Sequence, residues 1–235
     1  MGRWLVTILF LIVSAFLTQW IPFSSFFRNL NTLIHEFGHA LTTLVLSGKV
    51  LYIELYSDHS GVTRSAVKDS WAFIPVALAG YTTSSLFAWF MFSLDAKGKQ
   101  KLALSIITGI AVLSLILFVR NSFGMLWLAG FIALTVVVLL VGGQKLGRFY
   151  YLLISFLMLE DSVFGSFSLI LYAWEDSTSA GDATLLSQHT PLPAIVWAGF
   201  FTVFSLWCAV KALMTFIGPK NAPKPVTASN ESQLF

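Results

Sequence analysis

The residues best suited to chemistry in this chain are His35, Glu36 and His39, which form the pattern H-E-x-x-H inside an apolar stretch. Four residues make about one turn of an α-helix, so the two histidines fall on the same helix face. Two imidazoles placed in this way can bind one Zn²⁺, and the glutamate between them can accept a proton from a water molecule that the metal activates. The alternative is a pair of buried histidines held by polar neighbours. Because polar side chains are costly to bury in an apolar helix, the motif predicts a zinc site.

A catalytic zinc needs a third protein ligand, and several acidic residues are candidates for it. Glu160 and Asp161 lie in the middle of an apolar span, where an ionised carboxylate is costly unless it meets a cation or an aqueous cavity. Adjacent helical residues point about 100° apart, so only one of them can face the zinc helix, and we expect Asp161, with Glu160 as the alternative. Asp182 is a further candidate ligand, although its surroundings favour a helix N-cap or a role in closing the site.

Other polar residues are weaker candidates for chemistry. His59 and His189 are predicted in exposed loops, where histidine is usually an ordinary surface residue. Cys208 is the only cysteine, so zinc ligands must come from histidines and carboxylates. Arg120 and Asn121 separate two predicted spans. They are candidates to hold a substrate backbone or to pair with an acidic residue, and Arg120 alternatively extends to the lipid headgroups.

The composition predicts an integral membrane protein. The chain has 235 residues, of which 57% are hydrophobic and 11% charged, and its mean hydropathy is +0.80. In a typical soluble domain, about a quarter of the residues are charged. The net charge of +3 comes from lysines and arginines concentrated in short loops and the tail, where they set orientation and contact headgroups. We find no basic stripe with interleaved aromatic residues, which argues against nucleic-acid binding.

Apolar segments of about 20 residues predict a bundle of about six to seven transmembrane helices. They cover residues 4–20, a zinc helix at about 27–47, and then 71–94, 102–119, 122–141, 149–174 and 192–216. The segment 149–174 is interrupted near its middle by Glu160 and Asp161. Directly after the zinc helix, β-branched and aromatic residues around a polar turn predict a β-hairpin over about 49–67, lying at the membrane surface.

The expected fold class is therefore an all-α, multi-pass membrane protein with a short membrane-associated hairpin. It forms one polytopic domain over residues 1–217, followed by a disordered tail over 218–235 that is rich in proline and polar residues. The basic loops at 97–101 and 144–148 favour one orientation in the membrane, while the basic residues of the hairpin favour the opposite one.

Taken in order, these motifs resemble the site-2 protease family of intramembrane zinc metallopeptidases, and more closely its compact, B-type-like bacterial branch. The matching stretches are His35-Glu36-Phe37-Gly38-His39-Ala40, Ser60-Gly61-Val62-Thr63, Ala79-Gly80-Tyr81, Arg120-Asn121 with Gly124, and Gly181-Asp182-Ala183 before Pro193 and Trp197. The family's third ligand is a late-helix aspartate, often within Leu-Asp-Gly. Leu159-Glu160-Asp161-Ser162 is the nearest match, but it lacks the glycine, and the family's Asn-x-x-Pro element is missing.

The resemblance implies hydrolysis of peptide bonds in or near transmembrane segments of membrane-protein substrates, in the lipid bilayer of a bacterial cell. Our hypothesis is that His35, His39 and Asp161 bind Zn²⁺ and that Glu36 is the general base. One alternative is a non-catalytic, protease-like membrane scaffold or regulator, in which substitution of Glu36 has no effect. A small transporter with a metal in its pathway ranks last, because the other spans carry few polar residues.

Overall fold

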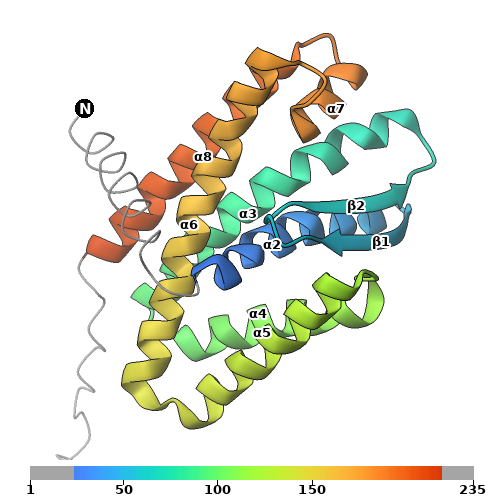
Figure 1. Cartoon of the computed structure of the whole chain (residues 1–235). Coiled ribbons are helices and arrows are strands. Elements are labelled where there is room, and N and C mark those ends of the chain that lie inside the picture. Colours follow the sequence, from blue (N-terminus) through green and yellow to red (C-terminus); the bar gives the residue numbers. More distant parts are fainter. Residues whose placement is uncertain (1–23, 219–235) are drawn as a thin grey trace, which may run out of the picture.

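The structure is a computed structural model that describes residues 24–218. The predicted first span and the tail from residue 219 onward lie outside the described residues. The described elements are α2 (Ser24–Val45), β1 (Lys49–Leu55), β2 (Gly61–Ala66), η1 (Ser70–Ala72), α3 (Phe73–Ala96), α4 (Gln100–Leu117), α5 (Ser122–Val141), α6 (Gly143–Glu175), α7 (Gly181–His189) and α8 (Ala194–Ile217) (Figure 1).

The protein is an all-α integral membrane protein with one small hairpin, as predicted. Five of the described helices are long and apolar enough to cross a membrane, namely α3 with the turn before it, α4, α5, α6 and α8. Helix α2, which carries the H-E-x-x-H motif, is not among them, since Arg28, Glu36 and both histidines interrupt its apolar sequence. Helix α6 continues through the acidic pair for 33 residues, so the interruption is one of polarity only and the helix itself is unbroken.

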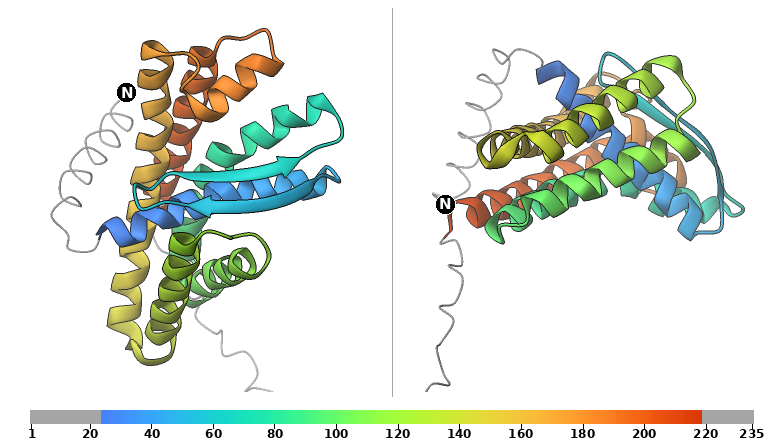
Figure 2. Two further views of the ribbon diagram at one scale, coloured as in Figure 1. Left: turned by 45° about the vertical axis from the view of Figure 1, so that its right-hand side comes forward. Right: turned by 90° about the horizontal axis from the view of Figure 1, so that it is seen from below.

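Helix α2 lies at the centre of the fold. It packs against α3, α6 and both strands of the hairpin, while α3, α6 and α8 also pack against one another (Figures 1 and 2). Leu30, Leu33 and Ile34 of α2 are fully buried in the main hydrophobic core. His35, Glu36 and His39 therefore lie on a helix that is packed against two other helices and the hairpin.

The hairpin is extended on one side by the link between α4 and α5. Strands β1 and β2 pair antiparallel, with Ile53 opposite Thr63. On the other edge of β1, the Ile53 N–H donates to the carbonyl oxygen of Phe118 at 2.9 Å, and the Ile53 carbonyl accepts from the Arg120 N–H at 3.2 Å. The link therefore covers the edge of β1, and within the described residues β2 pairs with β1 alone.

Asn121 completes this attachment with its side chain. Its amide nitrogen donates to the Leu55 carbonyl at 2.6 Å, and its amide oxygen accepts from the Leu55 N–H at 3.2 Å. The guanidinium group of Arg120 instead donates to carbonyl oxygens at the end of α4, including that of Leu117 at 2.7 Å. Arg120 therefore caps the C-terminus of α4, and Asn121 holds the α4–α5 link against β1.

A second, smaller hydrophobic cluster holds α7. Ala183 and Leu186 of α7 are fully buried against residues of α3, α6 and α8, such as Ala77, Leu169 and Phe201. This cluster places the first turn of α7 beside α3 and close to the middle of α2, although α7 is more than 130 residues later in the chain.

Candidate metal centre

Helix α2 presents His35 and His39 toward α3 and α7, as the four-residue spacing predicts, and Glu36 toward the hairpin. Glu36 and His39 are buried and His35 is half-buried. The Nε2 atoms of the two histidines lie 3.0 Å apart. Two imidazole nitrogens that approach one another so closely point at a common position.

Asp182, in the first turn of α7, supplies a third atom to the same position. Its Oδ2 atom lies 3.2 Å from His35 Nε2 and 3.3 Å from His39 Nε2. Burial raises the pKa of the Asp182 carboxyl, but the neighbouring imidazoles lower it and hold it below the usual range. Among residues 24–218, these three side chains form the one group of metal-ligating type whose ligand atoms converge.

The spacing of these atoms fits a tetrahedral zinc ion. Ligand atoms about 2.0–2.1 Å from a tetrahedral zinc lie about 3.3 Å from one another. The separations of 3.0, 3.2 and 3.3 Å agree with this value. Asp182 Oδ2 is also buried and accepts no hydrogen bond of good geometry from the described residues. A buried carboxylate oxygen in that position needs a cation.

Neighbouring groups orient the two histidines. The Nδ1 atom of His39 lies 2.7 Å from the carbonyl oxygen of Val76, and since a carbonyl only accepts, this nitrogen carries the hydrogen. The lone pair on Nε2 is then directed at the site, which is the usual orientation of a metal-binding histidine. The ring of Tyr81 meets the ring of His35 edge to face, with centroids 4.5 Å apart.

Glu36 is held by the hairpin. The hydroxyl of Thr63 on β2 donates to Glu36 Oε2 at 2.7 Å and also lies 3.0 Å from the Glu36 carbonyl oxygen. Within the described residues, Glu36 Oε1 accepts no hydrogen bond, and it lies beside Gly61. One carboxylate oxygen is therefore fixed, and the other is available to accept a proton.

The site opens into a cavity of about 440 Å³ between α2, β2, α3 and α7. All three ligand candidates and Glu36 line it, together with the strand residues from Gly61 to Ser65.

The structure places Asp161 away from the histidines, which corrects the expectation for the third ligand. Arg28, near the start of α2, pairs with Asp161 through Nη1 and with Glu160 through Nη2, the latter at 2.5 Å. The two acidic residues do meet a cation inside the membrane, as the cost of burying them requires, but it is a guanidinium group. Asp182 occupies the position expected for Asp161.

Asp182 also does not act as an N-cap. Helix α7 begins at Gly181, its N-cap residue is Ala180, and the Ala180 N–H donates to the side chain of Thr184 at 3.0 Å. In the sequence, the Gly181-Asp182 pair at the start of a short helix is the feature that marks Asp182 as a candidate. That Asp182 lies beside His35 and His39 depends on the packing of α7, which residue spacing along the chain does not reveal.

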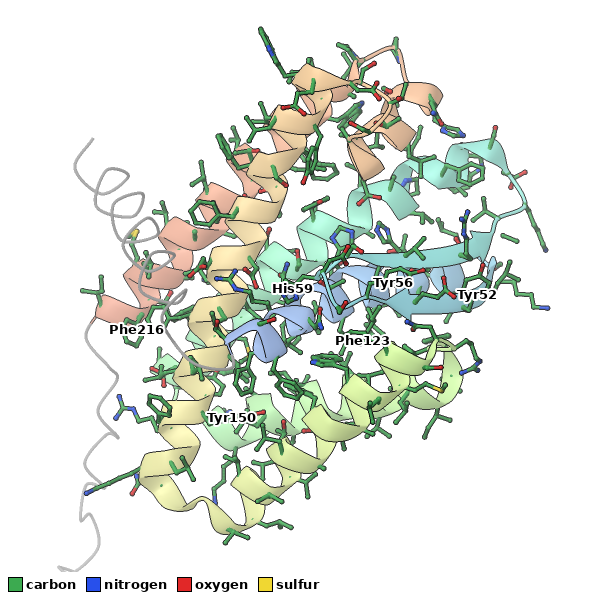
Figure 3. All side chains as sticks on the ribbon, viewed as in Figure 1. Tyr52, Tyr56, His59, Phe123, Tyr150 and Phe216 are labelled. Carbon is green, nitrogen blue, oxygen red and sulfur yellow. The ribbon has the colours of Figure 1, made fainter. Side chains whose placement is uncertain are left out.

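The remaining candidates lie outside the group of ligand atoms. His59, at the tip of the hairpin, contacts Ser25 and Asn29 at the start of α2 (Figure 3). His189 donates from Nδ1 to the Leu185 carbonyl oxygen of its own helix, at 2.9 Å. Arg120 and Asn121 support the α4–α5 link described above and are not among the residues that line the cavity.

Comparison with known proteins identifies a family for this chain. A family model described as Peptidase M50B-like matches residues 4–212. The chain belongs to this family. The match confirms the resemblance to the site-2 proteases and, with the five apolar helices, identifies an integral membrane protein of a peptidase family. Searches of the curated proteins and of the solved structures found no match.

Proposed function

We propose that this protein is a zinc-dependent intramembrane endopeptidase that hydrolyses peptide bonds in or near transmembrane segments of other membrane proteins, in a bacterial cell membrane. The observation that carries the proposal is the convergence of His35, His39 and Asp182 beside Glu36, in a cavity bordered by a strand. His35, His39 and Asp182 would hold the metal.

The chemistry divides between the metal and the chain. A zinc ion held by these three residues would supply a Lewis acid that makes a water molecule nucleophilic near neutral pH. Glu36 accepts the proton of the attacking water at Oε1 and then delivers it to the leaving amine nitrogen. Thr63 keeps the carboxylate in one rotamer by its hydrogen bond to Oε2. Because Glu36 is buried, its carboxylate exchanges this proton within a site that is largely shielded from bulk water.

The free edge of β2 supports binding of the substrate as an added strand. In an antiparallel ladder, opposite residues either exchange both hydrogen bonds or direct their N–H and C=O groups away from one another. Since Ile53 uses both groups to bind the α4–α5 link, its partner Thr63 directs both of its own groups toward the outer edge of β2. An extended peptide that pairs with Thr63 would pass directly beside Glu36.

The depth of the site suits cleavage inside the bilayer. Gly80 lies beside the histidines, seven residues from the start of α3 at Phe73 and sixteen from its end at Ala96. At the helical rise of 1.5 Å per residue, these intervals are about 10 and about 24 Å. The site is therefore below one membrane surface, where a substrate helix would need to unwind only near its end.

The metal content of the detergent-purified protein tests the ligand set. We expect about one zinc per chain in the wild type, in Asp161→Ala and in Glu36→Gln, and loss of zinc in Asp182→Ala and in His35→Ala/His39→Ala. Asp161→Ala is the matched control, because it removes another acidic residue that lies inside the membrane. Retention of zinc by Asp182→Ala together with its loss from Asp161→Ala would return the third ligand to α6.

Cleavage of a library of labelled single-span peptides in micelles tests the reaction. The wild type should cut a subset of these peptides, and Glu36→Gln, which keeps the size of the side chain but cannot accept the proton, should reduce the rate at least a thousandfold. Equal cleavage by both proteins would remove Glu36 from the mechanism. A wild type that contains neither zinc nor activity after reloading would favour the scaffold alternative.

A further inference from the structure

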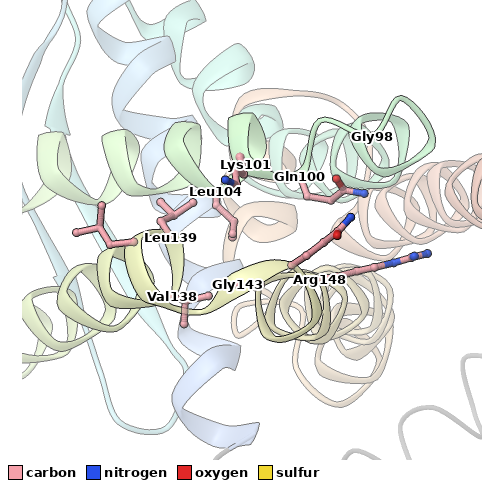
Figure 4. Close-up of a pocket in the computed structure, with 11 residues that line it drawn as sticks. Gly98, Gln100, Lys101, Leu104, Val138, Leu139, Gly143 and Arg148 are labelled. Atoms are coloured by element: carbon pink, nitrogen blue, oxygen red, sulfur yellow. The ribbon is translucent and has the colours of Figure 1, made fainter. Parts of the chain in front are cut away.

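A second cavity, of about 640 Å³, is lined by residues of α4, α5 and α6 (Figure 4). The turn between α5 and α6, which borders it, lies at the other end of the bundle from α7 (Figure 1). The cavity is bordered by the turn between α3 and α4, the end of α5 and the start of α6. Since α4 and α5 are both candidate membrane spans and run in opposite directions, the start of one and the end of the other meet at the same membrane surface. The cavity therefore lies at the depth of the lipid headgroups.

The walls of this cavity change from polar to apolar. Gln100 and Lys101 in the first turn of α4, and Gln144 and Arg148 in the first two turns of α6, contribute polar and cationic side chains. Figure 4 shows Lys101 and Gln100 on α4 and Arg148 on α6, on different sides of the cavity. Leu104, one turn further into α4, and Val138 and Leu139 near the end of α5 form the apolar part. This gradient matches a molecule with a polar head and an apolar chain.

The surroundings are strongly cationic. The α3–α4 turn, the α5–α6 turn and the helix starts that follow them carry five exposed basic residues, which are Lys97, Lys99, Lys101, Lys145 and Arg148. The chain has no Asp or Glu between residues 97 and 159. The nearest acidic residue before them, Asp95, is buried, accepts a hydrogen bond from Gln100 at 2.8 Å and does not line the cavity. The cavity thus attracts an anion, and no acidic side chain on its walls opposes one.

We propose that this cavity binds an anionic phospholipid of the surrounding bilayer. The phosphate lies between Lys101 and Arg148, close to the two helix starts, and an acyl chain follows Leu104, Val138 and Leu139 into the membrane. A pocket lined by basic residues between membrane helices is suited to such headgroups. This site is independent of the proposed proteolysis, since it shares no residue with the metal centre.

Native mass spectrometry of the full-length protein tests the proposal. The protein in detergent is titrated with phosphatidylglycerol, with phosphatidylcholine of the same acyl chains and with inorganic phosphate, and a variant Lys101→Gln/Arg148→Gln is compared with the wild type. The matched control is Lys49→Gln/Lys68→Gln, which removes the same charge from exposed positions of the hairpin region.

We expect the wild type and the control to prefer phosphatidylglycerol, and the cavity variant to bind it about tenfold to thirtyfold more weakly, because each basic residue near an anionic headgroup contributes about one kcal/mol. Phosphatidylcholine should bind all three proteins equally. The proposal is overturned if the control loses as much affinity as the cavity variant, or if inorganic phosphate binds as tightly as the lipid. The first result would indicate a general charge effect, and the second a site for a free anion.

Discussion

At the scale of single residues, the candidate metal centre depends on a position without a side chain. A Cβ atom on Gly80 would lie 2.4 Å from His35 Nε2 and 2.6 Å from His39 Nε2, where the proposed metal ligands need their space. We predict that Gly80→Ala displaces the imidazoles and lowers zinc occupancy at least tenfold. Zinc content of the purified protein measures this effect.

The control for this prediction is Gly199→Ala. Gly199 also lies inside an apolar helix, α8, but a Cβ atom there meets nothing within 4 Å. It should keep full zinc occupancy and increase stability slightly, because alanine favours the helix. Normal zinc in Gly80→Ala would show that α2 and α3 separate easily, and would contradict the close packing described here.

A second prediction concerns Thr63, the residue that positions the proposed general base, Glu36. Thr63→Val removes the hydroxyl that donates to Glu36 Oε2 and preserves the shape of the side chain. We expect kcat to fall about tenfold to a hundredfold with unchanged zinc content. Thr63→Ser should recover most of the activity in the peptide-cleavage assay. If serine were no better than valine, the role of Thr63 would be steric.

The sequence predicts the placement of the two histidines well, but it does not predict which carboxylate lies beside them, for a physical reason. Helical periodicity is local, so the four-residue spacing is sufficient to place His35 and His39 on one face. The approach of Asp182 depends on how α7 packs on α3 and α8, which no local pattern encodes. The rule that a carboxylate inside the membrane needs a cation was also correct for Asp161, but it did not reveal that the cation is Arg28.

At the scale of elements, the pairing of Arg28 with Glu160 and Asp161 links α2 to the middle of α6. We predict that Arg28→Met, which removes the charge, destabilises the protein by about 3–5 kcal/mol, because it leaves carboxylates buried without this cation. Thermal unfolding in detergent measures the loss. The variant Arg28→Met/Glu160→Gln/Asp161→Asn should recover much of it, since it removes the charges on both sides. No recovery would mean that the guanidinium group acts through packing and not through its charge.

The elements themselves follow largely from the sequence. The apolar runs predict α3, α4, α5, α6 and α8 to within a few residues, apart from α6, which begins six residues before its predicted start. The hairpin follows from its turn and its β-branched residues. Its attachment to the link between α4 and α5 does not, because this link is only a few residues long and is too irregular to resemble a strand.

At the scale of the whole molecule, the candidate metal centre joins two parts that are far apart in the chain. His35 and His39 belong to the central helix α2, whereas Asp182 belongs to α7, a short helix of nine residues that rests on its own small hydrophobic cluster. A metal bound there would therefore connect α2 to α7 as well as take part in the proposed reaction. A ligand that binds only the folded arrangement stabilises that arrangement in proportion to its affinity.

We predict that removal of zinc by a chelator loosens α7 without unfolding the bundle. Amide hydrogen exchange should become faster in residues 181–189, where Asp182 loses its partner, and remain unchanged in α4 and α5, which do not contact the site. Added zinc should restore the protection in the wild type and have no effect in Asp182→Ala, whose α7 should exchange rapidly in either condition. If chelation accelerated exchange in all helices equally, zinc would support the whole bundle. If it changed none of them, the packing of α7 on Ala77, Leu169 and Phe201 alone would be sufficient to hold Asp182 at the histidines.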